Sequence, residues 1–206
     1  MRPFVLASAS PRRRELLDAL RLRFTVVAAD LDEATIAGTL PPADAARTVA
    51  VAKALAVAAQ RPGDVVLAAD TMVVVDDLVL GKPVDPADAR RMLRVLRNRA
   101  HLVLTAVTVR SDAHEDTAVV SATVRMRDYS DAEIDRYVDE GTSLDRAGAY
   151  GIQDEPFRPV AAIEGCWCNV MGLPLWTAAR LLSRAGCVAG RAPDAAFARC
   201  AVCPSR

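Results

Sequence analysis

The chain has 206 residues, a length typical of one globular domain, and its 26 basic and 26 acidic side chains give a formal net charge of zero. The hydrophobic fraction is 52% and the charged fraction is 25%, as in ordinary soluble domains. A neutral chain has no overall attraction to nucleic acid or to a membrane surface, so any anion site must be local. No apolar segment is long enough to span a bilayer or to act as a secretion signal. We therefore expect a cytoplasmic protein without nucleic-acid or membrane partners.

Strand-like and helix-like patterns alternate along the chain, which is typical of an α/β fold. Strands or hairpins are expected over residues 2–7, 23–29, 65–75, 78–85, 101–110, 117–127 and 160–172. Helices are expected over residues 11–22, 45–60, 86–98, 131–140 and 175–185. The third expected strand is apolar apart from Asp70 and Thr71, as in a buried central strand, and the fifth and sixth alternate like antiparallel strands. The prediction is one domain with a mixed sheet over residues 1–185, followed by a loose tail over residues 186–206 that lacks periodicity.

The first expected helix begins with a concentration of positive charge, in the stretch LASASPRRRELL from Leu6 to Leu17. Ser10 suits the N-cap, and Pro11 suits the first helical position. Three arginines then occupy the first turn, where the helix dipole is already positive and each exposed charge costs about 0.3–1 kcal/mol. The backbone N–H groups of that turn point in the same direction, so the pattern favours a phosphate-like anion. The alternative is three solvated arginines.

Lysine stands at only two positions, Lys53 and Lys82, and the other 24 basic residues are arginine. A compact ammonium group suits a single phosphate oxygen, so the pattern favours phosphate binding over chance retention. Asp70 stands inside an apolar strand, where a carboxylate must meet a cation, a metal ion or hydrogen-bond donors, or lie at the exposed end of the strand. Glu33 or Asp32 would supply a second carboxylate, and such a pair suits Mg²⁺ held jointly with phosphate oxygens.

All five cysteines lie in the last fifth of the chain. An odd number without a secretion signal argues against a disulfide framework. Cys166, Cys168, Cys200 and Cys203 would allow a four-thiolate zinc site. The alternative is that the first two are small residues on one face of a strand, while the last two belong to the loose tail.

Six segments together resemble the Maf family of nucleotide pyrophosphatases: LASASPRRRELL, the LDE that ends at Glu33, VAKA around Lys53, AADTMVVVDDLVLGKP, AGAYGIQ and IEGCWCNVMGLPL. The resemblance runs from about residue 4 to residue 185. It implies an α/β fold like that of the inosine triphosphate pyrophosphatases, with an elongated mixed β-sheet flanked by helices in two lobes and a central cleft. It also implies hydrolysis of a nucleoside triphosphate to the monophosphate and pyrophosphate, with a divalent metal cofactor: Mg²⁺ first, Mn²⁺ or Co²⁺ as alternatives. By family analogy, the chain forms a homodimer.

The functional residues of the family carry over onto matching positions of this chain. By this resemblance, Asp70 is the catalytic carboxylate that activates water, and it shares the metal ion with Glu33. The phosphate-binding positions are Ser8, Arg13, Lys53 and Lys82. The positions that go with base preference are Arg12, Thr71 and Gln153.

Asp70-Thr71 and the segment from Tyr150 to Gln153 resemble the dTTP/UTP branch of the family, so dTTP, UTP and modified pyrimidine nucleotides are the predicted substrates. A 7-methyl-GTP or CTP pyrophosphatase of the same family is an alternative. A nucleotide-binding regulator without catalysis is another, because the family has been linked to arrest of septum formation. Two departures lie on the expected base side: residues 154–157 replace a glycine-rich piece, and residues 166–168 replace a segment in which serine or aspartate and tyrosine are common.

Overall fold

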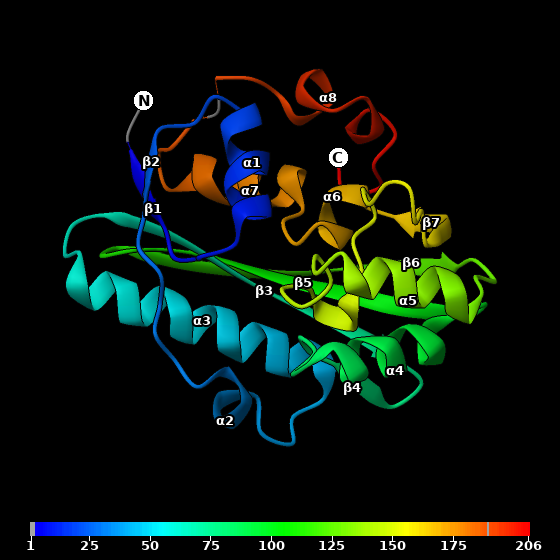
Figure 1. Ribbon diagram of the computed structural model, residues 1–206. Helices are drawn as coiled ribbons and strands as arrows, with labels where there is room; N and C mark the ends of the chain where they lie inside the picture. Colours follow the sequence, from blue (N-terminus) through cyan, green and yellow to red (C-terminus); the bar gives the residue numbers. More distant parts are fainter. Residues whose placement is uncertain (1–2, 189) are drawn as a thin grey trace.

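The computed structural model describes residues 3–188 and 190–206 and contains one mixed sheet with helices on both faces (Figure 1). Its strands are β1 (Phe4–Leu6), β2 (Phe24–Val26), β3 (Val65–Val75), β4 (Leu78–Leu80), β5 (Ala100–Ser111), β6 (His114–Met126) and β7 (Val160–Gly165). Its helices are α1 (Pro11–Ala19), α2 (Glu33–Ala37), α3 (Pro42–Gln60), α4 (Pro86–Leu96), α5 (Asp131–Asp139), α6 (Trp167–Val170), α7 (Leu175–Arg184), α8 (Pro193–Ala196) and the 3-10 turns η1 (Ala147–Ala149) and η2 (Ala198–Cys200). Met1 and Arg2 of the expected domain and Ala189 of the expected tail lie outside the described residues. None of the described helices is long and apolar enough to cross a membrane.

Within the described residues the sheet has seven strands in the order β2-β1-β3-β5-β6-β7, with β4 also paired to β3. Strand β1 runs parallel to β2 and β3 and the other pairings are antiparallel, which confirms the predicted mixed sheet. One edge of β3 pairs with β5 over residues 66–74. On its other edge, pairing with β1 ends at Leu67 and pairing with β4 begins at Val73. The residues between these two positions border a gap at the carboxyl end of β1.

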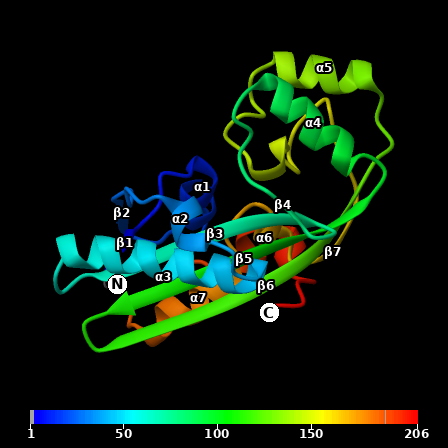
Figure 2. The same ribbon diagram turned by 90° about the horizontal axis from the view of Figure 1, so that it is seen from below.

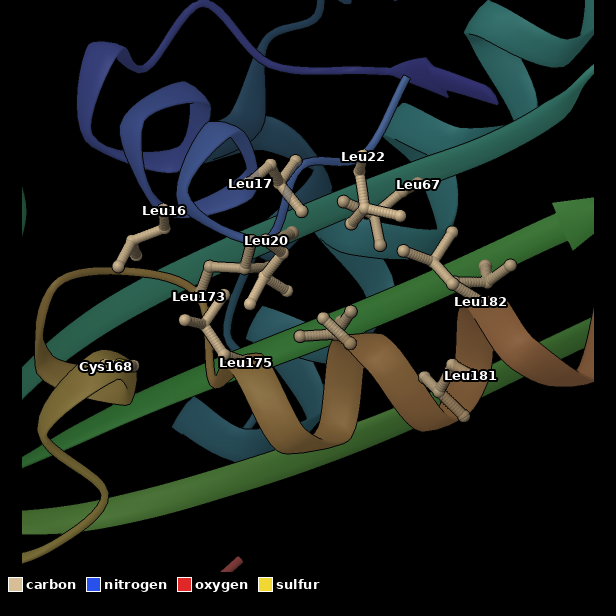
Figure 3. Packing of buried hydrophobic residues seen from close by; sticks show 14 of the residues in the cluster. Leu16, Leu17, Leu20, Leu22, Leu67, Cys168, Leu173, Leu175, Leu181 and Leu182 are labelled. Carbon is tan, nitrogen blue, oxygen red and sulfur yellow. The ribbon is translucent and has the colours of Figure 1, made fainter. Parts of the chain in front are cut away.

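The alternation of side chains along β3 separates two apolar layers. Val65, Leu67 and Ala69 pack with α1 and α7, and Figure 3 shows the leucines of these helices gathered over the sheet. The intervening Val66 and Ala68 pack against α3 on the opposite face. A further cluster joins α4, α5 and η1 near the other end of the long strands, where Figure 2 shows them as a separate lobe. This arrangement confirms the predicted elongated, two-lobed α/β fold.

Two short elements differ from the expected secondary structure for local reasons. Helix α2 forms where an acidic turn was expected, because the Asp32 side chain caps it by accepting a hydrogen bond from the Thr35 backbone N–H at 3.1 Å. The expected strand over residues 160–172 ends at Gly165, whose φ of 111° favours glycine and redirects the chain. The following residues form the helical turn α6. Cys166 and Cys168 are therefore not on a strand face.

Described residues on both sides of position 189 pack against the rest of the chain, which differs from the expectation of a loose tail over residues 186–206. Helix α8 and the turn η2 lie against the α1, α6 and α7 side of the molecule (Figure 1). Cys200 is 2% exposed and Cys203 is 7% exposed, and both belong to the apolar cluster of α1 and α7. The indole Nε1–H of Trp176 donates to the Cys200 carbonyl at 2.9 Å. The amino-acid sequence of this C-terminal segment shows no helical or strand periodicity, because only single residues of short turns make the buried contacts.

Candidate active site

A cleft of about 1000 Å³ opens beside the gap in the edge of β3 and is lined by residues of both lobes. This location, at the carboxyl end of a parallel strand, is common for ligand sites in α/β proteins. All nine site residues predicted from the sequence line the cleft, although they come from six separate segments of the chain. They are Ser8, Arg12, Arg13, Glu33, Lys53, Asp70, Thr71, Lys82 and Gln153. The fold thus gathers all of them around one volume.

The regular periods of β3 and α3 bring Asp70 and Lys53 together. Side chains alternate between the two faces of β3, so Asp70 lies on the same face as Val66 and Ala68, which pack against α3. On α3, Lys53 shares the buried face with Val49 and Val57, four residues to either side. Lys53 Nζ lies 2.9 Å from Asp70 Oδ1, and only 8% and 9% of the two side chains are exposed. The carboxylate inside the apolar strand therefore meets a cation, one of the partners that the sequence required.

A second carboxylate reaches the same ammonium group from α2. Glu33 Oε1 lies 2.8 Å from Lys53 Nζ, and half of the Glu33 side chain remains exposed. Asp32 instead accepts from Thr35 Oγ1 at 2.6 Å and from its backbone N–H, and these hydrogen bonds lower the pKa of Asp32. Glu33 and Asp70 are thus the pair held around one cation. Their oxygen donors fit a divalent ion such as Mg²⁺, whose other positions would be filled by phosphate oxygens and water.

Arg13 is the buried arginine of α1, and three of its N–H groups are engaged. Nε donates to the Gly172 carbonyl at 2.9 Å, Nη1 to Ser8 Oγ at 3.1 Å and Nη2 to Thr71 Oγ1 at 3.1 Å. Gly172 has a φ of 105°, a backbone conformation that favours glycine and that turns its carbonyl toward Arg13. Burial lowers the pKa of Arg13, while nearby carboxylates act in the opposite direction. Because a guanidinium carries five N–H donors, two remain for an oxyanion.

A chain of hydroxyl groups fixes the guanidinium of Arg13 from behind. Thr71 Oγ1 lies 3.0 Å from Thr105 Oγ1, which donates to the Asn169 carbonyl at 3.0 Å. Since Thr105 uses its proton on that carbonyl, Thr71 donates to Thr105 and accepts from Arg13. Thr105 and Asn169 are fully buried. No sequence pattern indicated either residue, because Thr105 resembles any other threonine of a strand and the burial of Asn169 depends on how α6 packs on β5.

The three arginines at the start of α1 lie in three different environments, as expected from the 100° rotation between neighbouring helical residues. Arg12 is half-buried and lines the cleft, Arg13 is buried behind it, and Arg14 is exposed. Burial lowers the pKa of Arg12, and the neighbouring charge of Arg146 lowers it further. The helix start therefore places two cations at the cleft, and the solvated alternative applies to Arg14.

Lys82 and Gln153 lie at the exposed part of the cleft, Lys82 after β4 and Gln153 after η1. The loop that carries Gln153 is held by a network that no sequence pattern indicated. Arg146 forms an ion pair with Asp154, whose carboxylate also accepts from the hydroxyl of Tyr137. The same carboxylate accepts from a backbone N–H in the loop at 2.9 Å. Asp154 departs from the family pattern, but its partners Tyr137 and Arg146 lie in other segments, so no local pattern indicated them.

The cleft combines carboxylates that suit a divalent cation with guanidinium and ammonium groups that suit phosphate oxygens. The carboxylates and the buried arginine lie on helices and on a strand, whereas the exposed glutamine lies on a second wall of the cleft that is built from a loop. Fold and site together define an α/β protein whose interlobe cleft fits a polyphosphate with a divalent cation.

The chain belongs to the Maf family, since the family model described as Maf-like protein matches residues 3–185. The dTTP/UTP pyrophosphatase of Anaeromyxobacter dehalogenans (strain 2CP-1) is 52% identical over 88% of this chain and 93% of that protein. The dTTP/UTP pyrophosphatase of Myxococcus xanthus is 49% identical, over 88% and 92%. That of Thermomicrobium roseum is 47% identical, over 88% and 84%. Among solved structures, a HAM1 protein from Coxiella burnetii is similar with a TM-score of 0.46 and 18% identity, over 63% of this chain and 75% of that chain.

Proposed function

We propose that this protein hydrolyses dTTP and UTP to the monophosphate and pyrophosphate, as an enzyme of cytoplasmic nucleotide pools. The observation that carries the proposal is one cleft in which Asp70 and Glu33 share the Lys53 ammonium group beside the buried guanidinium of Arg13. The names of relatives with 47% to 52% identity support the substrate class. A buried cluster of this kind contributes little to stability by itself, so a ligand is the better explanation for its presence.

The basic residues are proposed to bind the triphosphate and to stabilise charge that develops on the leaving pyrophosphate. Arg13 offers two N–H donors, and its other three are anchored, so the fork keeps one orientation. Lys53 contacts two carboxylates with an ammonium group that has three donors, which leaves one for a phosphate oxygen. Lys82, at the exposed part of the cleft, reaches the substrate as a flexible point charge.

Asp70 is proposed to accept the proton of the water that attacks the α-phosphorus. Its Oδ1 is held by Lys53, so the carboxylate has a fixed orientation and Oδ2 remains for the water. Glu33 and Asp70 are the residues that would hold a divalent cation, with Mg²⁺ preferred over Mn²⁺ or Co²⁺. When bound, such a cation supplies Lewis-acid stabilisation of the phosphate charge.

The base is proposed to lie toward Gln153 and Arg12, on the exposed side of the cleft. The amide of Gln153 offers both a donor and an acceptor, which complements the carbonyl and N–H edge of uracil or thymine. Thr71 is engaged with Arg13 and Thr105, so we infer that it affects preference through the position of Arg13.

The test is incubation of the purified protein with dTTP, UTP, CTP, GTP, ATP and 7-methyl-GTP in the presence of Mg²⁺, followed by measurement of pyrophosphate and monophosphate. We expect dTTP and UTP to give the highest kcat/KM, with no phosphate released directly from substrate. A preference for CTP or 7-methyl-GTP would contradict the proposed branch. Nucleotide binding without any turnover would contradict the proposed hydrolysis and favour a nucleotide-binding regulator. Asp77→Asn, at the exposed β3–β4 turn, is a control variant that should keep full activity.

A further inference from the structure

The loop between η1 and β7 carries Gln153 and has no regular secondary structure. It runs from Tyr150 to Pro159, and Gln153 is exposed where it lines the cleft. An exposed amide on an irregular loop distinguishes two bases well only if the loop already holds it in place, because ordering a free side chain and its backbone on binding costs affinity. The contacts that fix this loop therefore bear on base selection.

Asp154 closes the turn that contains Gln153. Its backbone N–H donates to the Gly151 carbonyl at 3.3 Å, and its carboxylate Oδ2 accepts from the Gly151 backbone N–H at 2.9 Å. Both polar groups of the Gly151 backbone are thus bonded to Asp154, with only Ile152 and Gln153 between the two residues. This double closure fixes the backbone on each side of Gln153.

The carboxylate of Asp154 is in turn held by two side chains from other segments. The hydroxyl of Tyr137, on α5, and Nη1 of Arg146, the residue before η1, both bind Asp154 Oδ2. Arg146 Nη1 also donates to the Tyr137 hydroxyl at 3.1 Å. Tyr137 is buried, and its ring stacks on that of Phe157 with 4.3 Å between the ring centres. One carboxylate oxygen thus collects three donors, which fixes the turn to the lobe of α4 and α5 seen in Figure 2.

Gly151 leaves room for this ion pair. A Cβ at this position would lie 2.7 and 2.8 Å from the two carboxylate oxygens of Asp154, and it would also collide with Arg146 Nη1. Both distances are far shorter than a favourable non-bonded contact of about 3.5–4.0 Å. The absence of a side chain at Gly151 therefore allows the carboxylate to reach the backbone N–H of the turn.

We propose that Asp154, Arg146 and Tyr137 are positioning residues for base selection, which hold the Gln153 amide toward a base with the carbonyl and N–H edge of uracil or thymine. This role rests on the proposed function, in which Gln153 contacts the base. Tyr137 does not line the cleft, so it acts on a bound nucleotide only through Asp154.

The alternative is that the ion pair only stabilises its lobe. A separate arginine, however, holds the far end of the same loop: the Arg127 side chain donates to the carbonyls of Phe157 and Arg158, each at 2.7 Å. Loss of the Asp154 carboxylate should therefore release the turn around Gln153 while the rest of the loop stays in place. A purely stabilising pair would instead affect all nucleotides equally.

The test compares the affinities of non-hydrolysable UTP and CTP analogues, with Mg²⁺, by titration calorimetry. The wild type should bind the UTP analogue more tightly, and in Asp154→Ala the ratio of the two dissociation constants should fall as far as in Gln153→Ala, by at most about tenfold. Tyr137→Phe keeps the stacked ring and removes one of three donors, so the ratio should fall about two- to threefold. Asp135→Ala removes an arginine-paired carboxylate of α5 outside the cleft and should keep the wild-type ratio.

The double variant Gln153→Ala/Asp154→Ala separates positioning from an independent contribution. If Asp154 acts through Gln153, the double variant has the same ratio as Gln153→Ala alone. Additive losses, or a wild-type ratio in both Asp154→Ala and Tyr137→Phe, would overturn the positioning role. Should Asp154→Ala fail to fold, Tyr137→Phe decides in the same way.

Failure of the proposed function gives a different result. Binding ratios that follow these expectations without any turnover would contradict the proposed hydrolysis and still support the positioning role. A wild type that binds the UTP analogue no more tightly than the CTP analogue would overturn the positioning role, whatever its rate of hydrolysis.

Discussion

The two lobes of the molecule bury polar groups in opposite ways. Around α1 and α3 the buried groups are ions: Lys53 lies between Asp70 and Glu33, and Arg13 binds three oxygen acceptors. Each of these ions can bind a further group, because its donors or acceptors are only partly used. The buried ions of the first lobe can therefore still bind a charged ligand.

Around α4 and α5 the most deeply buried polar groups are neutral, and the charged Arg146–Asp154 pair lies partly exposed beside the cleft. His101 Nε2 lies 2.7 Å from the Tyr150 hydroxyl, and burial lowers the pKa of His101 to about 4. The Tyr129 hydroxyl donates to the Leu93 carbonyl at 2.8 Å, and burial raises the pKa of Tyr129. These groups stay uncharged at neutral pH and complete a packed core. The comparison predicts that changes in the first lobe reduce catalysis, whereas changes in the second reduce stability.

The largest effect is expected for Asp70→Asn, which keeps the shape of the side chain and removes its charge. We expect kcat for dTTP to fall by about 10²–10⁴, the usual range for loss of a positioned acid–base group. The thermal midpoint should stay close to that of the wild type, because Lys53 keeps Glu33 as a partner. The measurement is pyrophosphate release with Asp77→Asn as control. Activity within a few-fold of the wild type would remove Asp70 from the mechanism.

The next largest effect on activity is expected for Arg13→Lys, which keeps the positive charge but loses the planar set of N–H donors of the guanidinium group. An ammonium group cannot hold Gly172, Ser8 and Thr71 together and still present two donors to a phosphate. We expect kcat/KM for dTTP to fall about 100-fold, equivalent to one or two charge-assisted hydrogen bonds. Arg14→Ala should change it less than about twofold, because that side chain is exposed outside the cleft.

Thermal shift with a non-hydrolysable dTTP analogue and Mg²⁺ provides an independent readout of Arg13. The analogue should stabilise the wild type and Arg14→Ala, and it should stabilise Arg13→Lys much less. Equal stabilisation of all three would show that the arginines at the start of α1 are surface charge alone.

The His101→Gln variant tests the neutral core of the second lobe through the pH dependence of stability. The unfolded histidine has a pKa near 6.5, and its folded pKa is about 4, so the unfolded state binds more protons between these values. The group thus stabilises the fold above pH 6.5, and this contribution is lost as the pH falls toward 4. The total is about 3 kcal/mol, with a slope of at most about 1.4 kcal/mol per pH unit.

Chemical denaturation of the wild type between pH 4.5 and 7 should therefore show a steeper loss of unfolding free energy than His101→Gln. His114→Gln, at the exposed start of β6, controls for the loss of a histidine. If the unfolding free energy changed with pH equally in all three proteins, His101 would not be the group whose protonation destabilises the fold. Activity per folded molecule should change less than stability, because His101 does not line the cleft and reaches it only through its hydrogen bond with Tyr150.

The regular part of the first lobe was predictable from sequence because its charges stand out against periodic apolar patterns. Strand β3 occupies the predicted residues 65–75, and the carboxylate at Asp70 is anomalous in that run. Ser10 and Pro11 mark the start of α1 at the expected positions, although the Ser10 side chain makes no capping hydrogen bond. Side chains repeat every 2 residues in a strand and every 3.6 residues in a helix, so the pattern fixes the face on which each side chain lies. The contact between Asp70 and Lys53 therefore follows once α3 is known to pack on that face of β3.

The Asp154 loop and the C-terminal packing depend on contacts between irregular segments, which have no periodic sequence pattern from which they could be predicted. Asp154 binds Arg146 and Tyr137 across a loop, and its partners are set by the position of α5. Cys200 and Cys203 pack against α6 from a segment whose composition resembles a flexible tail. Long-range contacts of this kind carry no local signature, so the second wall of the cleft and the C-terminal packing required the structure.

The smallest effect is expected at that second wall, for Gln153→Ala. The exposed amide is proposed to contribute about one hydrogen bond to the base, worth about 0.5–1.5 kcal/mol, so discrimination of UTP from CTP should fall by at most about tenfold. Gln153→Glu removes the donor and presents only acceptors, which suits the amino group of cytosine and not the carbonyl of uracil. The ratio of kcat/KM for UTP and CTP should therefore fall further in Gln153→Glu than in Gln153→Ala. Gln60→Ala, at the exposed end of α3, is the matched control. Unchanged ratios in both Gln153 variants would place base selection on the Arg12 side of the cleft.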